Sequence, residues 1–149
     1  MIIKKIFLLL MCLLLSNCGY QAIYSTKSDL NLPIKKFEFE GDKNINKKIV
    51  SMIGLKEEKQ NGYKLKLVSN KIIEVISKKK TGTASIYKTT INVSLSITDQ
   101  EKIIKKKQFN SSFIYNNTKN KFELEQYRRN IDSNLINKII EDIFIFLNT

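Results

Sequence analysis

Hydrophobic and polar residues alternate over most of residues 63–115, which is the pattern of half-buried β-strands. The alternation is clearest over residues 87–97, where apolar residues, Tyr and Thr take the odd positions and Lys, Thr, Asn and Ser take the even ones. Further strands are predicted over residues 63–77 and 103–115. Turns at residues 78–83 and 99–102 separate the three strands, so we expect an antiparallel meander with one covered face.

A shorter strand and a short helix precede this meander. Residues 34–40 alternate, with Phe37 and Phe39 on the same side. Asp42 is a good N-cap for the next segment, because its carboxylate accepts from free backbone N–H groups of a first helical turn. Apolar residues then recur at helical spacing as far as Gly54, which suits the C-cap position. These signals predict an amphipathic helix of about ten residues.

The last segment reads as a long amphipathic helix of about 25 residues. Asn120 and Glu123 have the spacing of a capping box at its start. Arg128 and Asp132 lie on the line that becomes its apolar stripe one turn later. We therefore expect the first turns of this helix to leave the sheet surface.

Together the elements predict an α+β fold in which two helices pack on one face of a mixed four-stranded sheet, in the order β-α-β-β-β-α. We assign residues 34–149 to a single α/β sandwich domain. A signal peptide is expected ahead of it.

The amino terminus has the organisation of a secretory signal. Lys4 and Lys5 are followed by ten apolar or sulfur-bearing residues at 6–15 and then by small polar ones. Ten residues are too few for a bilayer, which takes about 20. Leu15, Ser16 and Asn17 ahead of Cys18 resemble the lipobox of bacterial lipoproteins, in which the cysteine thiol is diacylated and becomes residue one.

This resemblance divides the amino-terminal region into two parts. Residues 1–17 are the expected lipoprotein signal peptide, and residues 18–33 are the acylated cysteine and a polar tether that ends at Pro33. The chain has two cysteines, and Cys12 lies within the signal. Cys18 is then left without a partner, which excludes a disulfide framework and favours modification. Its diacylglycerol and N-acyl chains are the only covalent groups we expect, and no other cofactor.

The net charge indicates polyanionic partners. Of the 26 basic residues, Lys4 and Lys5 leave with the signal, so 24 face 14 acidic ones, a net of +10. Such a charge attracts nucleic acid, anionic lipid headgroups or phosphorylated glycans, and a chain outside the cytoplasm meets mainly the last two. An alternative is that codon drift in an A- and T-rich genome enriched lysine on a solvated surface.

The residues needed for catalysis are scarce. Histidine is absent, which removes the commonest general base and most zinc sites. No glycine-rich phosphate loop joins a strand to a helix. The acidic pairs Glu57–Glu58 and Glu141–Asp142 fall in a linker and on the solvent side of a helix. We expect neither an enzyme nor a metal site.

Two basic regions are candidate binding sites. Lys78, Lys79 and Lys80 occupy the first hairpin turn, as a contact for phosphates or an acidic partner, or as a solvated turn. Lys105 to Lys107 are more simply read as protection of an edge strand.

The second region is at the start of the last helix. Arg128 and Arg129 are the only arginines, and with Lys121 they are candidates for a partner contact. The alternative is that they are engaged in intrahelical pairs, Arg128 with Asp132 and Arg129 with Glu125.

Several segments resemble one known family. Cys18-Gly-Tyr-Gln-Ala-Ile-Tyr24 is similar to the CGYxPLY opening of LptE, the lipopolysaccharide-assembly lipoprotein family. Ser112-Phe-Ile-Tyr115 and Phe122-Glu-Leu-Glu-Gln-Tyr-Arg-Arg129 are similar to the end of its last strand and the start of its last helix. The element order also matches.

The resemblance implies a protein without enzymatic activity, lipid-anchored at the periplasmic face of the outer membrane. Such a protein plugs the β-barrel translocon LptD, helps it assemble, and assists lipopolysaccharide transport to the surface. A free-standing periplasmic lipoprotein that binds an anionic envelope ligand is the alternative. Neither hypothesis involves nucleic acid.

Overall fold

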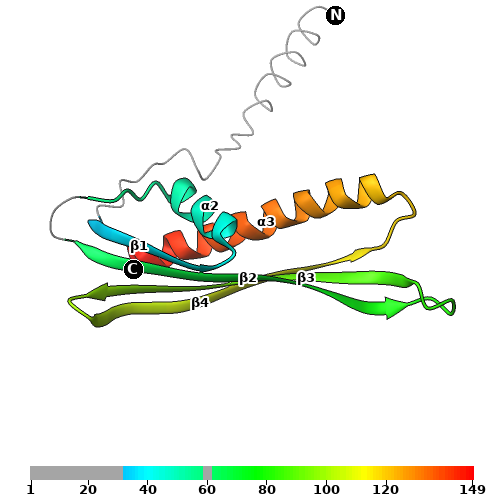
Figure 1. The fold of residues 1–149 in the computed structure, drawn as a ribbon, viewed down its shortest axis with the longest axis horizontal. Helices are drawn as coiled ribbons and strands as arrows, with labels where there is room; N and C mark the ends of the chain where they lie inside the picture. Colours follow the sequence, from blue (N-terminus) through cyan, green and yellow to red (C-terminus); the bar gives the residue numbers. More distant parts are fainter. Residues whose placement is uncertain (1–31, 59–61) are drawn as a thin grey trace, which may run out of the picture.

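The computed structural model describes residues 32–58 and 62–149 (Figure 1). The elements run in the order β1 (Ile34–Gly41), α2 (Lys43–Ile53), β2 (Tyr63–Lys78), β3 (Ala84–Asp99), β4 (Lys102–Asn116) and α3 (Lys121–Asn148). Both helices lie on the same side of one four-stranded sheet. The predicted α+β class and element order are confirmed. The predicted signal peptide, Cys18 and most of the tether lie outside the described residues.

The four strands differ greatly in length. They lie in the order β1-β2-β3-β4, with β1 parallel to β2 and the other neighbours antiparallel. β2 and β3 have 16 residues each and β4 has 15, but β1 has only 8. As a result, β1 borders β2 only from Tyr63 to Ser69.

Gly41 explains why β1 stops where it does. Its φ of 74° is in the left-handed region that favours glycine, and a Cβ there would lie 1.9 Å from the carbonyl oxygen of Ser69. The next amide, of Asp42, donates to that same oxygen at 2.9 Å. The chain therefore turns out of the sheet beside Ser69 and enters α2 directly.

The caps of α2 are those predicted. The carboxylate of Asp42 accepts from the N–H groups of Asn44 and Ile45 at 3.0 and 3.2 Å. At the other end, Gly54 has a φ of 81° and its N–H donates to the carbonyl of Val50 at 3.1 Å. Both ends of the helix thus have backbone groups satisfied locally.

The core lies between the sheet and the two helices. The odd positions of β3 form its floor, and the side chains of Ile91, Val93, Leu95 and Ile97 are at most 1% exposed. Ile139 and Ile143 of α3 are fully buried above them. The predicted alternation of residues 87–97 is confirmed, because the even positions carry polar side chains that remain partly exposed.

The opposite face of the sheet is mainly polar. Its cross-strand rows include three asparagines side by side, Asn70, Asn92 and Asn110. Neither α2 nor α3 lies on this face (Figure 1). Among the elements that the structure describes, the helices therefore cover one face of the sheet, as the sequence predicted.

The prediction that the first turns of α3 leave the sheet is wrong. Asn120 caps the helix, accepting from the N–H of Phe122 at 3.0 Å. Asp132 then pairs with Lys71 of β2 at 2.8 Å, and Arg128 contacts β4 through Tyr115. A row of charged residues on a helix can pack against a sheet when the strands below it carry oppositely charged side chains or aromatic rings.

The predicted ion pair between Arg128 and Asp132 is wrong for the same reason. Asp132 is taken by Lys71, and Arg128 instead pairs with Glu125 at 2.6 Å. Glu125 therefore pairs with Arg128, not with the predicted Arg129. Spacing along the helix indicates which ion pairs are possible. Which of them form depends on the side chains that the sheet places beside the helix.

Candidate functional site

The β2–β3 hairpin ends in three exposed lysines, Lys78, Lys79 and Lys80. The turn is closed by two backbone hydrogen bonds, from Lys79 N–H to the Thr83 carbonyl at 2.8 Å and from Gly82 N–H to the Lys79 carbonyl at 2.9 Å. Gly82 has a φ of 79°, in the left-handed region that glycine adopts readily. The hairpin reaches beyond the first turn of α3 (Figure 1). The three ammonium groups are thus held on an ordered projection.

The start of α3 lies at the same end of the molecule. Asn117, in the connection from β4, donates to the carbonyl of Ser85 from its backbone and to that of Ala84 from its side chain, both at 2.8 Å. These bonds hold the connection against the base of the hairpin. Exposed Lys121 follows as the first residue of α3, whose N-terminus carries positive helix-dipole charge. We call Lys78, Lys79, Lys80 and Lys121 the basic end.

Arg128 is not part of this exposed surface. Its guanidinium carbon lies 4.8 Å from the ring centroid of Tyr87, and its Nε donates to the Tyr115 hydroxyl at 3.1 Å. Burial alone lowers the pKa of Arg128, but the hydrogen bonds to Glu125 and Tyr115 outweigh this and raise it. The side chain is 22% exposed. Its described contacts are internal, and a partner-binding role for Arg128 stays a prediction.

The aromatic cluster around Arg128 was not identified from the sequence. Tyr87 and Tyr115 are paired across β3 and β4 and stack with ring centroids 5.6 Å apart. Tyr127 packs edge-on against Tyr115 at 6.0 Å, and the Thr89 hydroxyl donates to the Tyr115 hydroxyl at 3.2 Å. The sequence did contain a signal for this cluster. Two tyrosines occupy opposed positions on the sheet face that lies under α3, and α3 carries the only arginines of the chain.

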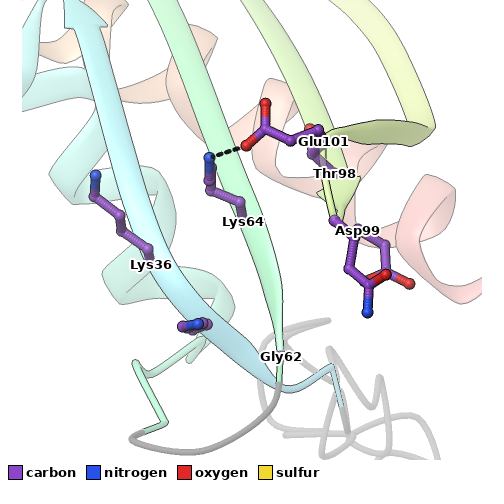
Figure 2. A pocket seen from close by; sticks show the side chains of 8 residues that line it. Lys36, Gly62, Lys64, Thr98, Asp99 and Glu101 are labelled. Atoms are coloured by element: carbon purple, nitrogen blue, oxygen red, sulfur yellow. Dashed lines mark hydrogen bonds and ion pairs between the residues drawn. The ribbon is translucent and has the colours of Figure 1, made fainter.

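Two hollows lie outside the basic end. One, of about 170 Å³, opens between β4 and α3 and has the half-exposed rings of Phe113 and Tyr127 on its wall. The other, of about 400 Å³, lies beside the β3–β4 turn, at the far end of β3 from the basic hairpin (Figure 2). There Lys64 pairs with Glu101 at 3.3 Å, so the charges of this hollow partly neutralise each other.

The described residues, 32–58 and 62–149, include no cluster of His, Cys, Asp and Glu that could hold a metal ion. None of the helices within these ranges combines the length and the hydrophobicity that a membrane-spanning helix requires. Cys18, the predicted lipid attachment site, lies outside them.

The fold resembles solved structures of bacterial lipoproteins. Rare lipoprotein B from Shewanella oneidensis superposes with a TM-score of 0.52 at 11% identity, over 72% of this chain and 92% of that one. Lipoprotein B from Nitrosomonas europaea superposes with a TM-score of 0.57 at 9% identity, over 76% and 81%. This chain has the fold of those lipoproteins. No protein-family model and no curated protein matches its sequence.

Proposed function

We propose that this protein is a non-enzymatic outer-membrane lipoprotein of the LptE type. In this role it plugs the LptD-type β-barrel translocon, helps it assemble, and assists the transport of lipopolysaccharide to the cell surface. The observation that carries the proposal is the shared fold with lipoprotein B, which agrees with the motif at Cys18. Rare lipoprotein B is a name of the LptE family. The fold and the amino-terminal motif are separate observations, because the motif lies outside the described residues.

Acylation of Cys18 would place the domain at the periplasmic face of the outer membrane. One acyl chain binds a bilayer only marginally, whereas two or more give stable anchoring. The tether that follows allows the domain to reach a barrel embedded in the same membrane. The acyl chains are the only covalent groups this function needs.

The basic end is the part of the molecule best suited to enter a barrel. Its lysines are exposed on a projecting hairpin, and the lumen of an outer-membrane barrel is polar. Ammonium groups bind phosphates or carboxylates through charge-assisted hydrogen bonds. We propose that Lys78, Lys79 and Lys80 contact the phosphates of lipopolysaccharide or acidic residues of the lumen, with Lys121 beside them.

Co-purification tests the barrel partnership. The full-length chain, tagged after Thr149, is isolated from solubilised outer membranes of its own host, and the eluate is analysed by mass spectrometry. We expect a large β-barrel protein in about equal amount. A chain recovered alone from the outer membrane would instead support the free-standing lipoprotein that binds an anionic envelope ligand.

The two cysteines provide a matched control for the anchor. Cys18→Ser should abolish acylation and leave an unprocessed or unanchored chain, whereas Cys12→Ser, in the expected signal, should be processed normally. Intact-mass measurement of the amino terminus distinguishes the products. A free Cys18 thiol behind an uncleaved signal would contradict the proposed localisation.

A further inference from the structure

The outer edge of β2 is unpaired over much of its length. β1 borders β2 only as far as Ser69, and no described strand pairs with the outer edge of residues 70–78. In a strand, half of the backbone N–H and C=O groups point to each side. Those on the outer side of residues 70–78 therefore lack a strand partner. This edge is a consequence of Gly41, which turns the chain away beside Ser69.

Apolar side chains flank this edge on both faces of the sheet. Ile72, Ile73, Val75 and Ile76 are 42 to 48% exposed. Ile73 pairs with Thr89, whose hydroxyl bonds Tyr115 under α3, so Ile73 lies on the covered side. By alternation, Ile72 lies on the polar face.

From Asn70 to Val75 the edge lacks the usual protection against pairing. Edge strands are normally blocked by lysines, proline or a bulge. Here the pairing of β2 with β3 is regular from Lys64 to Val75, and its register shifts only beyond that, between Val75 and Lys78. Lys71 pairs with Asp132 of α3. Glu74 is the one other charge between residues 70 and 77. The opposite edge, β4, carries three consecutive lysines at 105–107.

We propose that residues 70–78 of β2 bind an extended segment of another polypeptide by β-augmentation. The incoming strand would continue the sheet where β1 stops, and its backbone would pair with the free edge groups of β2. Its alternate side chains would pack beside Ile72 on one face, and beside Ile73 and Val75 on the other.

The charges favour an acidic partner segment over a second copy of this chain. The edge ends at Lys78, Lys79 and Lys80, and the whole chain carries a net charge of +12. If two copies paired antiparallel along the full edge, related by a two-fold axis, residue 70 of one copy would lie opposite residue 78 of the other. Glu74 would then lie opposite Glu74 of the second copy, and like charges directly opposite are destabilising. Acidic side chains near the lysines would be attracted instead.

Site-specific crosslinking tests the edge in the full-length chain in its native membrane. A photoreactive benzoyl-phenylalanine replaces Ile72, and the control position is Ile145, which is 61% exposed on α3. We expect Ile72 to crosslink to an extended acidic segment of one other protein. The second substitution Ile76→Lys should reduce the yield about tenfold, because an edge lysine blocks pairing. Phe122→Lys, at a 71% exposed side chain of α3, should leave it unchanged.

Backbone pairing has a readout that side-chain contact lacks. A synthetic peptide of the crosslinked segment is added to the detergent-solubilised full-length chain, and amide hydrogen exchange is followed by NMR. Alternate amides of residues 70–78 should become protected, because only outward N–H groups gain partners. Adducts of two copies of this chain, equal yields at Ile72 and Ile145, or unchanged exchange at these amides would overturn the proposal.

The proposed strand pairing at the β2 edge and the proposed barrel partnership can be refuted independently of each other. Co-purification with a barrel without protection of residues 70–78 overturns the edge and leaves the proposed function intact. If residues 70–78 pair with a strand of a protein that is not a barrel, the β-augmentation proposal is supported and the barrel partnership is contradicted.

Discussion

The Nε of Arg128 donates a 3.1 Å hydrogen bond to the hydroxyl of Tyr115, and so joins the first turns of α3 to β4. The same guanidinium lies over the ring of Tyr87 and pairs with Glu125. One arginine thus connects a helix to two strands just behind the basic end.

Arg128→Ala should destabilise the domain by about 2 kcal/mol, because it removes a cation–π contact, a hydrogen bond and packing of the side-chain stem. Arg128→Lys should recover only part of this, since an ammonium cannot stack and donate in the same geometry. Urea unfolding measures both. Arg129→Ala is the control and should change the free energy of unfolding by less than about 0.5 kcal/mol. Equal losses at the two arginines would contradict the structural role of Arg128.

Gly41→Ala should be far more damaging than Gly54→Ala. Both glycines have positive φ, 74° and 81°, but a Cβ at Gly41 would lie 1.9 Å from a backbone oxygen, whereas one at Gly54 would meet no atom within 4 Å. We expect about 1 kcal/mol for Gly54→Ala from backbone strain alone. Gly41→Ala should cost about 3 kcal/mol or more, because β1 must shift from β2. Equal urea midpoints for the two variants would show that β1 accommodates the added Cβ without strain.

The β3–β4 turn should be improvable by substitution. Gln100 and Glu101 both have positive φ, 41° and 74°, which is the signature of a type I′ turn that favours Asn-Gly. Replacing them with Asn and Gly should stabilise the domain by about 1 to 2 kcal/mol.

Glu101→Gln is the control for the turn substitution. It removes the ion pair with Lys64 but keeps the strained backbone, and the Glu101 side chain is 89% exposed. An exposed pair contributes little, so we expect a change below about 1 kcal/mol. Thermal denaturation separates the two effects, and a loss of stability in the Asn-Gly variant would refute the turn assignment.

Replacing Lys78, Lys79 and Lys80 together with Ser should weaken lipopolysaccharide binding about tenfold at low salt, with little effect on stability. The difference from wild type should shrink as salt rises, because screening removes the contribution of exposed charges. Titration with purified lipopolysaccharide measures it.

The same triple substitution at Lys105, Lys106 and Lys107 is the matched control. It removes an equal charge from β4, at positions paired with residues 95–97 and therefore far from the hairpin tip. If both triple variants bind equally at low salt, net charge and not the basic end governs binding.

The helices and strands and their order follow from local patterns in the chain. Alternation over residues 87–97, the cap at Asp42 and the glycine at Gly54 act through local backbone geometry and burial of one face, and both are encoded by neighbouring residues. The turn at residues 78–83 and the exposure of its lysines followed from the same local signals.

Which side chains contact one another depends on how the helices pack on the sheet. Asp132 had a possible partner one helical turn away in Arg128, but the packing of α3 on the sheet brought Lys71 within 2.8 Å. The early end of β1 likewise depends on the approach of Gly41 to Ser69, and that approach leaves the β2 edge open. Contacts between residues distant in the chain depend on strand register and helix placement, and no local pattern specifies these.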